Sequence, residues 1–231
     1  MVIPTFNSPD VLHHMLTSLK TNTDWGGRIV LVNNGDKLPY TPDVDMLIEA
    51  GSNLGWMGGV NAGLKEADTE FFCMANDDLL FVPGSNAFWY TLEHTLDIIV
   101  PTVGGVAPSS NYVSGCQNAF WHSKAQLVDA PYLIGMLAMY PTELLKELGG
   151  LDETLPGGDD LDLSIRVRDR GFHLVVAREA YVHHIGSQTG RREQPEYWDS
   201  QKHQTETMNA LITKHGMQKW YDCWMGQPKE L

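Results

Sequence analysis

Two acidic segments of this 231-residue chain carry side chains that could do chemistry, and Asn76-Asp77-Asp78 is the first of them. It places two adjacent carboxylates directly after the apolar run 71–75. Hard divalent cations prefer carboxylate and phosphate oxygens, so these side chains could hold a cation together with a diphosphate. Asparagine and aspartate also favour turns and helix caps, so an ordinary turn is the alternative interpretation.

The second acidic segment, Asp159-Asp160, follows two glycines and opens a helix that we predict over residues 159–170. Acidic side chains at a helix start are stabilised by the helix dipole, so a capping role accounts for them. Alternatively, one carboxylate removes a proton from an acceptor hydroxyl, and the glycines leave room for a substrate. Asp162 is a third carboxylate of this segment, and Arg166 and Arg168 follow in the same helix and could hold the carboxylates that do not act as the base.

Residues 53–63, NLGWMGGVNAG, are dense in glycine and lead into a helix that we predict over 58–67. Glycines let backbone approach a ligand, and the N–H groups of a helix start favour anions. The spacing matches neither GxGxxG nor a P-loop, so it does not support a dinucleotide or a Walker-type ATP site. A tight loop is the alternative, but Asn53 and Asn61 inside the segment favour ligand contact.

Strands and helices that alternate along the first half must position these segments. We predict strands at 2–4, 28–32 and 70–75 and a helix that begins at Pro9, and this alternation favours parallel pairing. Ligands of such sheets lie beyond the carboxyl ends of the strands. Polar residues gather at these ends, namely Thr5, Asn7, Asn33, Asn34 and Asn76 to Asp78.

The second half is less regular. We predict strands at 133–140 and 172–177, and one tail helix over about 196–214. His183 and His184 follow the second of these strands, where a histidine is either a metal ligand or part of a polar surface.

Charge divides the chain unevenly. Residues 1–190 carry 10 Lys or Arg and 23 Asp or Glu, the whole net charge of −13, whereas residues 191–231 carry six of each. We therefore predict a main domain over 1–190 and a helical, aromatic appendage over 191–231. The acidic balance argues against nucleic acid or an anionic membrane as a partner.

Two further features predict the setting in which the chain works. No run approaches the ~18–20 apolar residues of a membrane span, and the start VIPTFN lacks the basic region of a signal peptide. The three cysteines are far apart and odd in number, which favours buried thiols in a reducing compartment. We therefore expect a cytoplasmic protein without a membrane span.

Taken in order, the motifs resemble those of the family 2 glycosyltransferases with the GT-A fold, and most of all the rhamnosyltransferase-like branch. The resemblance covers about four-fifths of the chain and rests on VIPTFN, LVNNG, NLGWMGGVNAG, ANDD, GGLDE, GGDDLDLSIR and YVHHIGSQTG. It implies an α/β, GT-A-like fold, in which helices flank a Rossmann-like mixed sheet in a single domain. It also implies an inverting, non-processive transfer of one sugar from a nucleoside-diphosphate sugar, with Mn²⁺ or Mg²⁺ as cofactor.

The resemblance assigns roles to individual residues. The donor nucleotide sugar would be bound by Pro4, Thr5, Asn7, Asn33, Asn34, Asn53, Gly55, Gly59, Asn61, Asn76 and Asp77. Asp78 would be the main metal ligand, with help from Asp77 and His183, and His184 would be the reserve choice. Asp160 would be the catalytic base beside Asp159, which stands where the family usually has glutamate.

Other functions and partners stay open at this point. The chain lacks the QxxRW motif of processive synthases, but it could be a degenerate transferase that only binds a nucleotide sugar or glycan. A nucleotidyltransferase would need a glycine-rich, arginine-containing N-terminal loop, which PTFNSPD replaces. The acceptor could be a glycan, a lipid-linked sugar, a small metabolite or a protein. Trp220, Tyr221 and Trp224 could pack on the core, form a homodimer contact or line the acceptor cleft.

Overall fold

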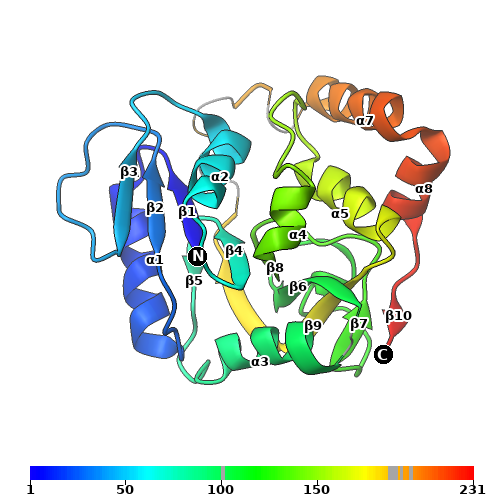
Figure 1. The fold of residues 1–231 in the computed structure, drawn as a ribbon, viewed down its shortest axis with the longest axis horizontal. Helices are drawn as coiled ribbons and strands as arrows, with labels where there is room; N and C mark the ends of the chain where they lie inside the picture. Colours follow the sequence, from blue (N-terminus) through cyan, green and yellow to red (C-terminus); the bar gives the residue numbers. More distant parts are fainter. Residues whose placement is uncertain (100–101, 187–191, 193–194, 198–199) are drawn as a thin grey trace.

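A ten-stranded mixed sheet forms the centre of the computed structural model, which describes residues 1–99, 102–186, 192, 195–197 and 200–231 (Figure 1). The strand order is β10-β7-β9-β6-β8-β4-β1-β2-β3, and β5 pairs with β9. The strands are β1 (Val2–Thr5), β2 (Val30–Asn33), β3 (Met46–Glu49), β4 (Phe71–Ala75), β5 (Leu79–Leu80), β6 (Val103–Ser110), β7 (Leu127–Asp129), β8 (Leu137–Pro141), β9 (His173–His184) and β10 (Lys229–Glu230).

Four parallel strands, β4, β1, β2 and β3, make up one half of the sheet. The parallel pairing predicted for the first three apolar runs is therefore confirmed. In the other half β8 runs antiparallel to both β4 and β6. The sequence pattern did not predict β3 or β6, because neither alternates clearly between polar and apolar residues.

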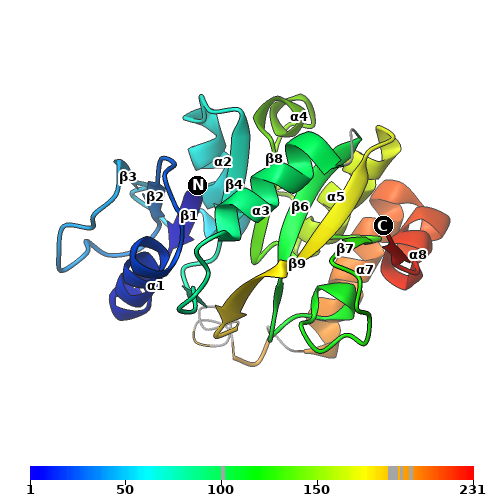
Figure 2. The same cartoon turned by 90° about the horizontal axis from the view of Figure 1, so that it is seen from below.

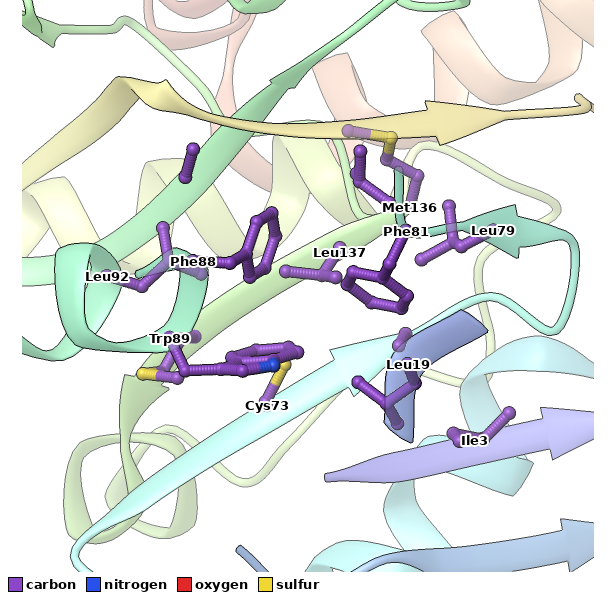
Figure 3. Close-up of a cluster of buried hydrophobic side chains, with 14 of the residues drawn as sticks. Ile3, Leu19, Cys73, Leu79, Phe81, Phe88, Trp89, Leu92, Met136 and Leu137 are labelled. Carbon is purple, nitrogen blue, oxygen red and sulfur yellow. The ribbon is translucent and has the colours of Figure 1, made fainter. Parts of the chain in front are cut away.

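Helices cover both faces of the sheet (Figures 1 and 2). One face packs against α1 (Pro9–Asn22) and α3 (Phe88–His94), and Figure 3 shows α3 side chains directed at Cys73 and Leu137. The other face packs against α2, α4 and α5, whose bounds are Gly55–Lys65, Thr142–Glu147 and Asp159–Asp169. Apolar residues at helical spacing build these contacts, as the sequence predicts for α1.

The described part of the tail differs from the single helix that we predict. It holds α7 (Gln201–His215) and α8 (Met217–Met225), separated by Gly216, whose φ of 85° ends α7. The aromatic cluster therefore lies on a helix of its own. Both helices and β10 pack against the main domain, since β10 pairs with β7 and Cys223 of α8 lies in a core cluster with Leu161 of α5.

None of the helices in the described ranges is long and apolar enough to cross a bilayer. Cys73, Cys116 and Cys223 are buried thiols, as the sequence predicts.

A buried ionic cluster fastens the tail to α5. Asp162 is 0% exposed. Its carboxylate lies 2.7 Å from Arg166, 2.6 Å from Lys214 and 2.7 Å from His215, the last two at the end of α7. Burial alone would raise the pKa of Asp162, but these three partners outweigh it and the pKa is lowered. Arg168 holds no acidic residue of its own helix; it pairs with Asp129 at 2.6 Å.

Asp162→Ala should lower the free energy of unfolding by about 3–5 kcal/mol, because it removes the buried carboxylate that joins Arg166 of α5 to Lys214 and His215 of α7. Urea denaturation measures this loss. Asp169→Ala on the same helix is the matched control, since its ion pair with Lys219 is exposed and worth at most about 1 kcal/mol. Equal losses in the two variants would show that the buried cluster does not fasten the tail.

Candidate active site

The carboxyl ends of β1 and β2 bring three of the predicted nucleotide-binding residues together. Thr5 and Asn33 are register partners, and the Asn34 backbone N–H donates to the Thr5 carbonyl at 2.9 Å. All three are buried. Asn33 donates through Nδ2 to Glu49 at 2.7 Å, and Glu49 ends the neighbouring strand β3. Glu49 escaped prediction because β3 itself was not recognised in the sequence.

Thr5, Asn33 and Asn34 form a strand-end cluster. Beside it, Asn7, which follows β1, contacts Gly35 and Asp36, which follow β2. Asn7 has a φ of 49°, and its Oδ1 accepts from the Asp36 backbone N–H at 2.7 Å. A Cβ on Gly35 would collide with the Asn7 side chain. The NNG motif therefore needs a glycine at its third position so that the two loops can meet.

The glycine-rich segment packs α2 closely against β1. A Cβ on Gly59 would lie 2.8 Å from the Pro4 Cβ, so only glycine allows this approach. Asn34 donates to the Gly55 carbonyl at 3.1 Å. Asn53 accepts from the Gly55 N–H at 2.8 Å and forms the turn that begins α2. The segment therefore lies beside the strand-end cluster, as predicted.

Asn61 has a different role from the ligand contact that we predict for it. Its side-chain amide and carbonyl both pair with the Leu151 backbone at 2.8 Å, and the amide also reaches Glu153. Because these bonds use both ends of the side chain, Asn61 ties α2 to the loop that carries GGLDE. No local spacing could indicate this contact, since the partners are 90 residues apart.

Asp77 faces β1. Its carboxylate accepts from the Thr5 hydroxyl at 2.6 Å. Burial raises the pKa of Asp77 to about 6, although the Thr5 hydrogen bond acts in the opposite direction. Arg192 of the tail donates to Ser8 Oγ at 2.9 Å and to the Phe6 carbonyl at 2.7 Å.

Asp78 faces β9. Its Oδ2 accepts from the Gly186 N–H at 3.1 Å, whereas its buried Oδ1 has no hydrogen bond within the described residues. His184 Nε2 lies 3.1 Å from this Oδ1. His184 Nδ1 lies 3.3 Å from the Tyr112 carbonyl, so we assign the ring proton to Nδ1. The Nε2 lone pair then faces both the Asp78 carboxylate and the Asn76 amide, whose Nδ2 lies 3.2 Å away. Oδ1 and Nε2 are electron-rich atoms at a separation that a shared cation would fit.

The two adjacent histidines point to opposite faces of β9. His184 is buried against Asp78, whereas the His183 ring contacts Tyr181 at 3.5 Å. The structure thus brings the reserve choice, His184, to Asp78 and leaves His183 elsewhere. The reason is that β9 extends through both histidines instead of ending at 177, and side chains alternate along a strand.

Asp159 and Asp160 begin α5, after Gly158 with its φ of 73°. Asp159 accepts from the Trp56 indole N–H at 3.0 Å, a contact across 103 residues that spacing could not indicate. Asp160 accepts only from the Leu161 backbone N–H, at 2.8 Å, among the described hydrogen bonds. Burial, and after it the neighbouring Asp159, raises the pKa of Asp160 to about 7.

The segment 135–136 joins the two acidic clusters. The Asn76 backbone N–H donates to the Met136 carbonyl at 2.8 Å. The adjacent Gly135 lies beside the other cluster, since a Cβ there would be 3.9 Å from Asp159 and from Asp160. Carboxylates from distant parts of the chain therefore converge on one region. Within the described residues, no three His, Cys, Asp or Glu side chains are grouped as a complete metal site.

Comparison with known families identifies the chain. The profile described as Glycosyl transferase family 2 matches residues 1–149, which is well over half of the sequence. The chain belongs to glycosyl transferase family 2. The motif series predicted this family, and its last part, residues 187–190, lies outside the described residues.

Named relatives of this family 2 chain are distant. It is 24% identical over 204 residues to the pre-mycofactocin glycosyltransferase of Mycobacterium tuberculosis. This match covers 80% of this chain and 42% of that protein. It is 20% identical over 221 residues to the O-antigen chain rhamnosyltransferase RfbN of Salmonella typhimurium. This match covers 87% of this chain and 70% of that protein. The chain thus spans about two-fifths of the length of the first of these relatives.

Solved structures confirm the predicted α/β, GT-A-like fold of this family 2 chain. A mannosyltransferase of Pyrobaculum calidifontis matches with a TM-score of 0.66 at 17% identity, over 97% of this chain and 69% of that chain. GalNAc-T7 matches with a TM-score of 0.66 at 16% identity, over 82% and 44%. At such identities the likeness concerns the fold.

Proposed function

We propose that this chain transfers one sugar from a nucleoside-diphosphate sugar to an acceptor hydroxyl, with inversion at the anomeric carbon and with a divalent cation as cofactor. The observation that carries the proposal is the convergence of two carboxylate clusters on the segment 135–136. Two matched structures were solved with GDP-Man and Mn²⁺ and with UDP, GalNAc and Mn²⁺, which supports a nucleotide-sugar donor and a cation.

In this proposal the donor nucleotide lies at the ends of β1 and β2. Thr5, Asn33 and Asn34 are buried there beside α2, and Asp77 shares a hydrogen bond with Thr5. Asp78 and His184 would hold Mn²⁺ or Mg²⁺ through the facing atoms Oδ1 and Nε2. When bound, the cation supplies positive charge opposite the leaving diphosphate.

Asp160 is the proposed general base. The Trp56 indole N–H donates to the Asp159 carboxylate and fixes its position. Among the described hydrogen bonds, the Asp160 carboxylate accepts only from the Leu161 backbone N–H of the same helix. Asp160 takes the proton of the acceptor hydroxyl while that oxygen bonds to the anomeric carbon. The bond from this carbon to the diphosphate oxygen breaks on the opposite face, so the configuration inverts. A pKa of about 7 suits a base that works near neutral pH.

Asp160→Asn should lower the release of nucleoside diphosphate from UDP-, dTDP- and GDP-sugars with Mn²⁺ by about 10²–10⁴-fold, while calorimetric donor affinity stays unchanged. The wild-type rate should rise with pH through about 7 as Asp160 loses its proton. The raised pKa also means that ionisation of Asp160 opposes folding as the pH rises from 3.8 towards 7. The variant should therefore gain more in melting temperature at pH 8 than at pH 5.

Asp169→Asn is the control for both measurements, because this residue lies on the same helix in an exposed ion pair. A variant at position 160 that keeps a wild-type rate would rule out the base assignment. Nucleotide binding without any donor hydrolysis by the wild type would favour the degenerate binding protein instead. The Asn at position 76 and the Asp at position 159, where the family usually has aspartate and glutamate, motivate that alternative.

The two histidines provide a matched pair for the metal site. His184→Ala should remove most of the rise in melting temperature that GDP or UDP gives in the presence of Mn²⁺, because the variant lacks the Nε2 atom that faces Asp78. His183→Ala should keep that rise, because its ring points away from Asp78. Thermal shift with and without Mn²⁺ measures both. The reverse result would restore His183 as the metal ligand.

A further inference from the structure

A second hollow lies outside the donor site, between the loop that follows β6 and the end of α8. Its volume is about 260 Å³. Its walls come from the 3₁₀ helix Gly115–Gln117, from the segment 131–134 and from residues 224–228 of the tail. The described residues that line it are Ser114, Gly115, Cys116, Gln117, Trp121, Pro131, Tyr132, Ile134, Trp224, Met225, Gly226, Gln227 and Pro228.

Aromatic rings dominate this pocket. Tyr132 and Trp224 stack at an interplanar angle of 16°, with their centroids 5.9 Å apart, and Trp224 remains 47% exposed. Trp121 forms another wall and is held by the Arg178 guanidinium, 5.3 Å from its ring centroid. Aromatic faces carry negative charge density, so they attract the slightly positive C–H faces of a sugar ring.

The polar groups of the pocket are neutral. The hydroxyls of Ser114 and Tyr132 lie 3.3 Å apart, and each keeps further capacity because a hydroxyl has one donor and two acceptor sites. The amides of Gln117 and Gln227 also line the walls. No charged residue is among the described lining residues. This set fits a neutral ligand with several hydroxyls and does not fit a diphosphate.

The pocket lies next to the proposed base. Ile134 lines it, and the following residue, Gly135, lies beside Asp159 and Asp160. Burial, and after it the negative charge of Asp160, raises the pKa of Tyr132, even though the hydrogen bond with Ser114 lowers it. The wall of the pocket therefore continues directly into the segment that lies beside the proposed base.

We propose that this pocket is an acceptor subsite that holds one sugar ring of a carbohydrate acceptor, with Tyr132 and Trp224 as its stacking platform. The inference rests on the proposed transferase function and names the acceptor class. A volume of about 260 Å³ is slightly below the ~300–1,000 Å³ of drug-sized sites, which suits a single ring. Trp224 is then a binding residue that the tail supplies to the main domain.

Methyl glycosides of glucose, galactose, mannose, N-acetylglucosamine and rhamnose are suitable probes, because their aglycone is too small to stack by itself. At least one should bind the wild type in ligand-observed NMR, in the presence of GDP or UDP and Mn²⁺. Trp224→Ala should weaken that binding about tenfold, because it removes the stacking face. Trp224→Tyr should restore most of it.

Tyr221→Ala is the matched control, because Tyr221 is an exposed aromatic residue on the same helix that does not line the pocket. It should bind the glycosides like the wild type. Wild-type protein that binds none of the five glycosides, or binding that survives Trp224→Ala, would overturn the subsite. If n-hexanol binds the pocket and none of the five glycosides does, the pocket is an alkyl-chain site and the proposed subsite is wrong. Release of nucleoside diphosphate from UDP-, dTDP- and GDP-sugars by the same samples tests the transferase function separately.

Discussion

Three carboxylates lie in the first turn of α5, and their contrasting surroundings link the tail of the chain to the proposed site. Asp162 faces inward and is neutralised by Arg166, Lys214 and His215. Asp159 and Asp160, in the same first turn, pair with no cation among the described residues, and their pKa values are raised by burial. Carboxylates with raised pKa values and no cation of their own are suited to accept a proton near neutral pH or to face a bound cation.

This contrast explains why the tail matters to the site. Two of the partners of Asp162, Lys214 and His215, come from the end of α7, so the tail holds the helix that carries Asp160. The following helix α8 places Trp224 against Tyr132, next to the same acidic pair. The division into 1–190 and 191–231 stays a prediction from charge, but the described contacts make the tail part of the same core.

The sequence predicted what depends on local pattern and missed what depends on distant contacts. Apolar runs that end in Asn or Asp located the strand ends correctly, since this signal lies within a few residues. Which of the two histidine side chains faces Asp78 depends on how far β9 extends. A one-residue change in the register of the strand would exchange the two. The partners of Trp56 and Asn61 lie 103 and 90 residues away, so only the folded chain reveals them.

The central claim is that a cation and a diphosphate bind between Asp78 and the face of α5 that carries Asp160. The most direct test is a crystal structure with Mn²⁺ and GDP or UDP, in which anomalous scattering locates the manganese. We predict one peak within coordination distance of Asp78 Oδ1 and His184 Nε2, with diphosphate oxygens completing the shell. A nucleotide-bound structure whose manganese lies away from Asp78 would contradict the account.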